Sequence, residues 1–131
     1  METNDAKVSV LAVDDSKTML AMMSAYLKDS NFELVATANS GPEAVQKYLE
    51  IRPQLVLLDV VMPEVTGIET LEQILDADTR ACVVMVSSLG TESTVQECLK
   101  KGAKSFVQKP IEKKGMLATL TSVCEKAGVE L

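Results

Sequence analysis

Short apolar runs and longer segments of helical period alternate five times along the chain. The apolar runs are rich in aliphatic residues, as expected for strands of a buried sheet, and they cover residues 8–13, 33–38, 55–58, 82–86 and 105–108. After each run, apolar residues recur every three or four positions, which is the period of one helix face. The pattern therefore predicts five strands, each followed by a helix.

The expected helix ends carry sequence signals of their own. The first apolar stripe predicts a helix over residues 16–30, and Gly102 is expected to cap the end of the fourth helix. Ser40–Glu43 and Thr66–Glu69 match the capping box, in which the first and fourth residues bond each other's backbone N–H groups. Gly115 interrupts the last stripe near its start, so the first residue of that helix stays open.

Five strand-then-helix units in succession indicate an α/β protein with a parallel sheet. Right-handed crossovers place helices on both faces of such a sheet, so we predict a doubly wound five-stranded sheet, order 2-1-3-4-5, with five helices. The length of 131 residues fits one domain, and no repeat, linker or low-complexity segment divides it.

Composition and charge narrow the classes of function. The net charge of −6 argues against nucleic acid as a partner, because binding to phosphate backbones draws on clustered Lys and Arg. The chain contains no His, which excludes Ser-His-Asp and Cys-His catalysis and His-ligated zinc. Its three cysteines are far apart, so we expect buried thiols. No signal peptide and no membrane-length apolar run are evident, so we expect a cytoplasmic protein with no membrane contact.

Polar residues stand where four of the five predicted strands end. Asp14 and Asp15 follow the first strand, Asp59 the third, Ser87 the fourth and Lys109 the fifth. In an open doubly wound sheet, ligands bind outside the carboxyl ends of the strands, where the strand order reverses. That point lies between the first and third strands, so we expect the three aspartates to lie together.

Three neighbouring carboxylates repel one another, and a hard dication would relieve this repulsion. Mg²⁺ is the abundant ion with this chemistry, since it binds carboxylates together with waters and phosphate oxygens. The Lys109 ammonium and the Ser87 hydroxyl would add donors for phosphoryl oxygens. The sequence thus predicts a magnesium-dependent cradle for a phosphoryl group, with a carboxylate as the nucleophile.

These residues also have plainer interpretations. An acidic pair before a helix is commonly an N-cap, a function that Asp15 or Ser16 would serve. Taken alone, Ser87 would be a turn residue, Lys109 a surface charge and Phe106 a core residue. Their combination at the ends of the appropriate strands favours the functional interpretation.

Four segments together resemble the receiver domain of bacterial response regulators, a CheY-like family with the flavodoxin-like form of the fold predicted above. The segments are Val13-Asp14-Asp15-Ser16, Leu58–Pro63 with Gly67, Val86-Ser87-Ser88, and Phe106–Pro110. The resemblance extends from residue 7 to about residue 127, so we expect the whole chain to form a single receiver domain.

The resemblance implies where phosphate and metal would bind. Asp59 would accept a phosphoryl group from a partner histidine kinase, and Asp14 and Asp15 would join Asp59 in holding Mg²⁺, with the backbone carbonyl of Val61. Proteins of this family catalyse only their own phosphorylation and dephosphorylation, so no separate enzymatic activity is expected. We expect a monomer, with phosphorylation-linked dimerisation as an alternative.

The resemblance also implies how the signal would leave the site. Ser87 and Lys109 would contact the phosphoryl oxygens, and the Lys109–Pro110 peptide bond would be cis. Phe106 matches the aromatic switch residue of the family, which works together with Ser87. Phosphorylation would then reshape the surface of the fourth helix, fifth strand and fifth helix, where a downstream protein target binds.

At two positions this chain has apolar residues that differ from those of receivers that lose their phosphate quickly. Val61 and Leu89 stand where such receivers tend to carry polar or amide groups, and we expect both to restrict the access of water. Met85–Leu89 resembles receivers of the chemotaxis methylesterase type, while the chain length resembles single-domain regulators. Phe106 replaces the tyrosine common in flagellar-motor regulators.

Several functions compete for this site, and a two-component signalling switch is favoured, with chemotaxis as one candidate pathway. A magnesium-dependent phosphohydrolase with an aspartyl nucleophile would need a second acid two residues later, where Val61 stands. A pseudo-receiver that only binds would lack an acid or the lysine, and all are present. A receiver that belongs to a larger regulator, such as a methylesterase, stays open as an alternative to a single-domain switch.

Overall fold

The computed structural model describes residues 7–88 and 90–129, in which five strands alternate with five helices. In chain order these are β1 (Val8–Val13), α1 (Lys17–Leu27), β2 (Phe32–Ala38), α2 (Gly41–Ile51), β3 (Leu55–Asp59), α3 (Gly67–Ala77), β4 (Val83–Ser87), α4 (Glu92–Lys100), β5 (Ser105–Gln108) and α5 (Lys113–Ala127). All strand pairs are parallel, and the strand order is β2-β1-β3-β4-β5. The predicted fold is confirmed.

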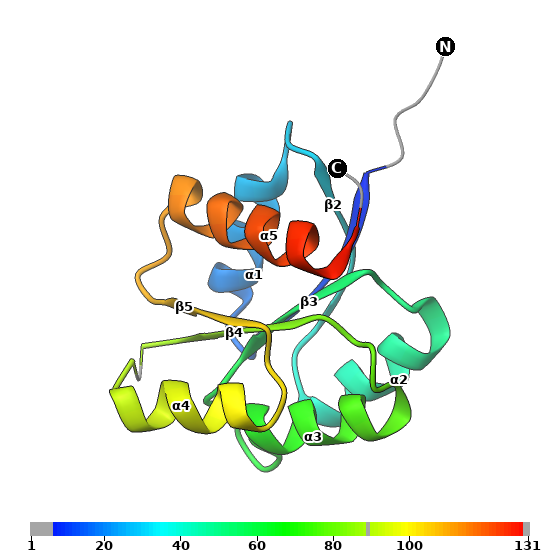
Figure 1. The fold of residues 1–131 in the computed structure, drawn as a ribbon, viewed down its shortest axis with the longest axis vertical. Helices are drawn as coiled ribbons and strands as arrows, with labels where there is room; N and C mark the ends of the chain where they lie inside the picture. Colours follow the sequence, from blue (N-terminus) through cyan, green and yellow to red (C-terminus); the bar gives the residue numbers. More distant parts are fainter. Residues whose placement is uncertain (1–6, 89, 130–131) are drawn as a thin grey trace.

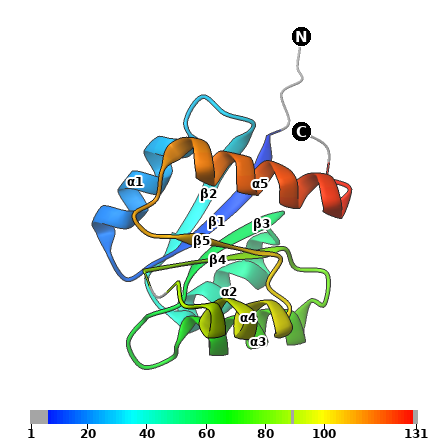
Figure 2. The same cartoon turned by 60° about the vertical axis from the view of Figure 1, so that its left-hand side comes forward.

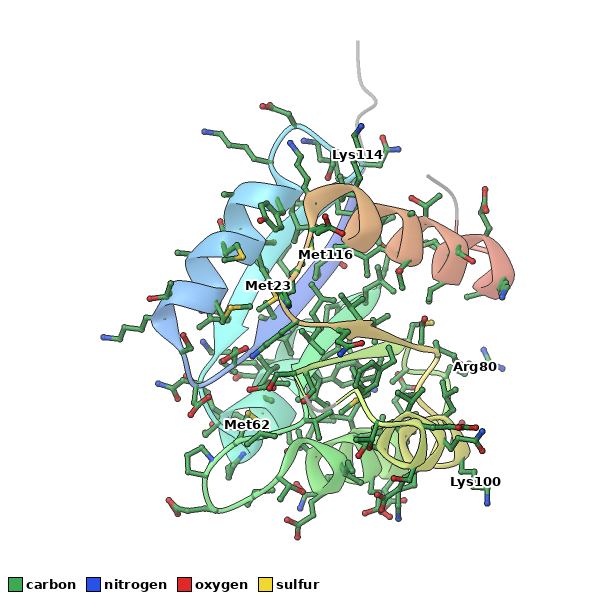
Figure 3. All side chains as sticks on the ribbon, turned by 90° about the vertical axis from the view of Figure 1, so that its left-hand side faces the viewer. Met23, Met62, Arg80, Lys100, Lys114 and Met116 are labelled. Atoms are coloured by element: carbon green, nitrogen blue, oxygen red, sulfur yellow. The ribbon has the colours of Figure 1, made fainter. Side chains whose placement is uncertain are left out.

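The sheet lies between two helical layers, with α1 and α5 on one face and α2, α3 and α4 on the other (Figure 1, Figure 2). Successive residues of β1 alternate between two buried clusters, because side chains along a strand point to opposite faces. Met23 of α1 and Met116 of α5 pack in the first cluster (Figure 3). Every residue of β3 and β4 is buried, as expected for central strands covered on both faces.

Side-chain caps begin most of the helices. Ser16 is the N-cap of α1, and its Oγ accepts a hydrogen bond from the Met19 N–H at 3.2 Å, so the plainer interpretation of Ser16 is correct. The Thr66–Glu69 capping box is confirmed, with both reciprocal bonds present. The Ser40–Glu43 box forms only in part. Ser40 accepts from the Glu43 N–H, but Glu43 reaches back to the Asn39 N–H, one residue before the cap.

The ends of several elements differ from the predicted ones. Helix α1 ends at Leu27 instead of Ser30, because Asp29 takes a left-handed conformation and Ser30 Oγ donates to the Leu27 carbonyl. Strand β4 covers Val83–Ser87, one residue later than expected, since its pairing with β5 continues to Ser87. Strand β2 begins one residue early, at Phe32.

Helices α4 and α5 frame the last strand. Among the nine described residues of α4, Cys98 is the buried one, and Gly102 follows the helix with a φ of 110°, as expected for its capping position. Helix α5 begins at Lys113 and includes Gly115, which resolves the start left open by the sequence. All three cysteines are buried free thiols, as predicted. In the described part of the chain, no helix has the length and apolar character needed to span a membrane.

Candidate functional site

Three carboxylates meet at the carboxyl edge of the sheet. Asp14 follows β1, Asp15 comes next, and Asp59 ends β3, which lies beside β1 with Val13 opposite Leu58. One carboxylate oxygen from each aspartate lies within 4.8 Å of the other two. Asp14 and Asp59 are buried, whereas Asp15 is exposed. The three aspartates therefore lie together, as their positions at the ends of the predicted strands indicated.

Asp14 is fixed on both carboxylate oxygens. Its Oδ1 accepts a hydrogen bond from the Ser16 N–H at 2.9 Å, and its Oδ2 lies 3.1 Å from Lys109 Nζ. The same ammonium lies 3.6 Å from Asp59 Oδ1. Lys109 follows β5 and its backbone N–H donates to the Ser87 carbonyl, so the sheet itself holds the lysine over the acids. The Lys109–Pro110 bond is cis, as the resemblance implied.

The Asp59 carboxyl is held in an environment that disfavours its charge. Burial and the nearby charge of Asp14 raise the pKa of Asp59 from 3.8 to about 6, while Lys109 and the Val61 N–H act in the opposite direction. The Lys109 ammonium pairs with two of the three carboxylates, so the cluster has an excess of negative charge. A hard dication with oxygen ligands fits this donor set.

The other residues predicted for the site differ in burial and in their contact with the three aspartates. Ser87, at the end of β4, is buried, and Phe106 in β5 is half-buried and packs against the cluster under α2, α3 and α4. The Val61 N–H donates to Asp59 Oδ1 at 3.3 Å, while its side chain is 52% exposed. Leu89 lies outside the described residues, so its predicted role in restricting water stays a prediction.

Gly67 has a physical role that the sequence did not reveal. It begins α3, its N–H donates to the Val60 carbonyl at 2.9 Å, and the helix start packs directly against the backbone of Asp59. The sequence pointed to Gly67 only as part of a motif and as a member of the Thr66 capping box. The signal that could have revealed this packing is a glycine at the first position of a helix that begins shortly after the acidic end of β3.

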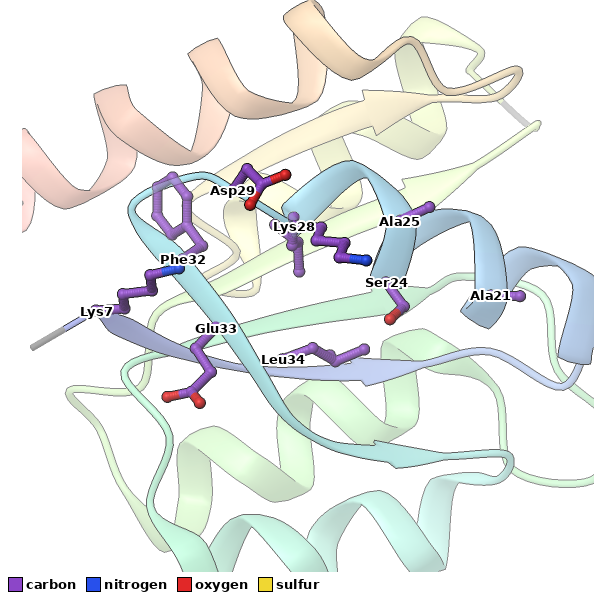
Figure 4. Close-up of a pocket in the computed structure, with 10 residues that line it drawn as sticks. Lys7, Ala21, Ser24, Ala25, Lys28, Asp29, Phe32, Glu33 and Leu34 are labelled. Carbon is purple, nitrogen blue, oxygen red and sulfur yellow. The ribbon is translucent and has the colours of Figure 1, made fainter. Parts of the chain in front are cut away.

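The site does not coincide with the large open hollows of the surface. A groove of about 710 Å³ lies between α1 and β2, at one edge of the sheet (Figure 4). Lys7 and Lys28 line it together with Asp29 and Glu33, so its charges are mixed. It contains none of the acidic cluster.

Comparisons with known proteins agree with this geometry. Residues 10–121 match the family model of the response regulator receiver domain. The chain is 44% identical over 113 residues to the chemotaxis protein CheY of Listeria monocytogenes, covering 86% of this chain and 95% of that protein. It is 46% identical over 107 residues to a protein-glutamate methylesterase/protein-glutamine glutaminase of Bacillus licheniformis, covering 79% of this chain but 29% of that enzyme.

A solved structure gives the same result. In the CheX-CheY-BeF3-Mg+2 complex from Borrelia burgdorferi, one chain superposes with a TM-score of 0.85 and 38% identity, over 88% of this chain and 87% of that chain. The fold, the edge of the sheet where the acids meet and these matches define one class: the chain belongs to the response regulator receiver family of two-component signal transduction. Receivers bind Mg²⁺ at an acidic pocket, and Asp14, Asp15 and Asp59 form an acidic cluster here.

Proposed function

We propose that Asp59 is the phosphoacceptor of this receiver and that a histidine kinase is the donor. A carboxylate oxygen of Asp59 attacks the phosphorus of a phosphohistidine, an O–P bond forms, and the N–P bond breaks with its electron pair passing to the imidazole nitrogen. The observation that carries the proposal is the position of Lys109 Nζ, 3.6 Å from Asp59 and 3.1 Å from Asp14. This places a cation where negative charge is transferred.

The choice of Asp59 among the three acids rests on their bonding. Both oxygens of Asp14 are engaged, by Ser16 and Lys109, so its carboxylate is tied to the scaffold. Asp15 is exposed and makes no ion pair within the described residues. Asp59 is buried at the end of a central strand, where a bound phosphoryl group would be held by a rigid element.

The carboxylates of Asp14, Asp15 and Asp59, with the backbone carbonyl of Val61, would hold Mg²⁺. When bound, the ion offsets the negative charge of the cluster and of the incoming phosphoryl oxygens. Lys109 would pair with a phosphoryl oxygen, and the Ser87 hydroxyl would donate to another.

The output would be a change in protein contacts. Ser87 and Phe106 lie on neighbouring strands, β4 and β5, where Ser87 pairs with Gln108 and Phe106 with Met85. A phosphoryl group that draws Ser87 toward it favours a packing in which Phe106 turns inward, which alters the face formed by α4, β5 and α5. The similarity to chemotaxis CheY proteins supports a downstream protein target on this face, in a cytoplasmic chemotaxis pathway.

Phosphorylation with acetyl phosphate and Mg²⁺ tests the acceptor directly. Intact-mass spectrometry is expected to show the addition of one phosphoryl group to the wild type and none to Asp59→Asn. The matched control is Asp76→Asn, an exposed acid of α3 that should still be modified. Modification of Asp59→Asn to the wild-type extent would assign the acceptor to another residue.

A further inference from the structure

Both arginines of the chain line one groove, at the edge of the sheet opposite the acidic cluster. Arg52 and Arg80 are the two arginines among the 13 basic residues, and both border a hollow of about 480 Å³. Lys104 lines the same groove from the loop before β5. These residues precede β3, β4 and β5, so the groove lies at the amino ends of the three strands. A strand such as β3 separates it from Asp59 by roughly 13 Å.

The Asp78 carboxylate connects residues on two sides of the groove. Asp78 Oδ2 accepts a hydrogen bond from Tyr48 Oη at 2.8 Å and lies 3.4 Å from Arg52 Nη1. Asp78 Oδ1 accepts from the Arg80 N–H at 3.0 Å. The Arg52 guanidinium also lies over the Tyr48 ring, 5.8 Å from its centroid. Asp78 thereby links the end of α2 to the loop that carries Arg80.

The other two cations of the groove have no acidic partner. Within residues 7–88 and 90–129, neither the Arg80 guanidinium nor the Lys104 ammonium makes an ion pair. Among the described residues, three cations and one carboxylate line the groove, an excess of two positive charges in a chain whose net charge is −6. In the groove between α1 and β2, by contrast, two lysines and two carboxylates balance one another (Figure 4).

We propose that this groove binds a phosphate dianion, either free or as the monoester of a small molecule. A phosphate group carries close to two negative charges at neutral pH, which matches the excess charge of the groove. Guanidinium groups form paired hydrogen bonds with phosphate oxygens, and lysine adds a further cation. The volume of about 480 Å³ lies within the range of small-molecule sites. This site is separate from the proposed phosphorylation of Asp59 and does not depend on it.

Titration of the full chain with inorganic phosphate, and in parallel with glycerol 3-phosphate, tests the proposal by NMR. The buffer contains EDTA and no divalent ion, so that phosphate is not drawn to the acidic cluster, and NaCl keeps the ionic strength constant. We expect saturable shifts of the Arg52, Arg80 and Lys104 amide signals, while signals near Asp59 stay unchanged. Tighter binding of the ester would identify a phosphorylated metabolite as the ligand class, and equal affinities would identify free phosphate.

Charge-neutralising variants decide whether the groove itself is responsible. Arg80→Gln and Lys104→Gln are exposed changes that leave the Asp78 bonds in place, and each should weaken binding by at least about tenfold. Lys114→Gln removes the same charge at the start of α5, well away from Arg80 (Figure 3), and should leave the affinity unchanged. The proposal is overturned if the shifts do not saturate, or if Lys114→Gln weakens binding as much as the two groove variants.

Discussion

Gly67 packs so closely against Asp59 that a Cβ atom at position 67 would overlap the Asp59 backbone carbonyl oxygen. The same Cβ would lie 2.7 Å from Val60 Cα, so both possible neighbours are backbone, which has little freedom to move aside. The start of α3 thus fixes the position of the residue that we propose as the phosphoacceptor.

We expect Gly67→Ala to displace this backbone, lowering the free energy of unfolding by roughly 1–3 kcal/mol and slowing phosphorylation by acetyl phosphate. Gly115→Ala is the matched control. A Cβ there meets no atom within 4 Å, and Ala in a helix is up to ~1 kcal/mol more favourable than Gly. Urea denaturation and the rate of mass increase measure both effects. Equal stability of the two variants would show that the backbone around Asp59 accommodates a Cβ atom at position 67 with no loss of stability.

The exposed acid of the cluster should carry much of the metal affinity. Asp15 makes no ion pair within the described residues, so its carboxylate is available to a cation, whereas Asp14 is bonded on both oxygens. We expect Asp15→Ala to weaken Mg²⁺ binding by at least about tenfold. Chemical shifts of Phe106 and the acidic loop during a Mg²⁺ titration report the affinity, with Asp76→Ala as the control. Unchanged shifts in the wild type would contradict the metal site.

Val61 is expected to limit hydrolysis of the phosphorylated form. Its side chain is half-exposed beside Asp59, and it offers no hydrogen bond that would orient a water molecule behind phosphorus. Val61→Asn should speed dephosphorylation by up to ~10-fold, which corresponds to about 1.4 kcal/mol of barrier. Leu89→Glu, at a position outside the described residues, should add to this effect.

Val61→Ala distinguishes the two ways in which valine would act. It removes bulk without adding a hydrogen-bond donor or acceptor, so a rate equal to that of Val61→Asn would assign the effect to exclusion of water. A wild-type rate already as high as that of Val61→Asn would refute the role of Val61. The decay of the phosphorylated mass with time is the measurement.

Ser87 should couple phosphorylation to the switch without being required for phosphorylation itself. We expect Ser87→Ala to be phosphorylated on Asp59 but to lose the change in the Phe106 ring signals. The chain contains two Phe and two Tyr, so these signals are simple to assign. Ser88→Ala, at the exposed next residue, is the control and should behave as the wild type. A Phe106 response that persists in Ser87→Ala would uncouple this serine from the switch.

The Tyr48–Asp78 hydrogen bond should make stability depend on pH at both extremes. The Tyr48 hydroxyl lowers the pKa of Asp78, and burial together with Asp78 raises the pKa of Tyr48. A lowered carboxyl pKa stabilises the fold at neutral pH, and this contribution is lost as pH falls below about 3.8. The raised pKa of Tyr48 also stabilises the fold below pH 10. This contribution to stability is lost as the pH rises above 10 and the hydroxyl ionises.

Urea midpoints at several pH values test this coupling. Asp78→Asn should be less stable than the wild type at pH 7, and the difference should shrink below about pH 3.8, where the wild-type carboxyl also becomes protonated. Asp76→Asn, two residues earlier, should show no such dependence. A pH-independent difference for Asp78→Asn would mean that its charge does not contribute.

The sequence predicted the sheet and the acidic cluster for one reason. Parallel strands end at a common edge, so Asp14, Asp59 and Lys109 had to converge once the strands were recognised. The amino ends of the strands converge by the same rule, yet the positions of Arg52 and Arg80 were not recognised in the sequence because isolated cations in loops are ordinarily solvent-exposed.

The predicted ends of helices were wrong where local backbone geometry determines them. The apolar period continues past Leu27, and nothing in it signals the left-handed conformation of Asp29. Likewise, the sequence of the Ser40 cap does not show that the turn brings the Asn39 N–H, instead of that of Ser40, to Glu43. The close approach of Gly67 to the Asp59 backbone depends on the distance between a helix and a strand, which no sequence period encodes.

Helix α4 is attached to the sheet mainly through the one buried side chain, Cys98, among its nine described residues. A helix with so small a buried area should separate from the rest of the protein at low free energy, by local rather than global unfolding. Amide protons of α4 are therefore expected to exchange with solvent faster than those of β3 and β4. Helix α4, which follows β4 and Ser87 in the chain, would then rearrange readily even before a partner binds.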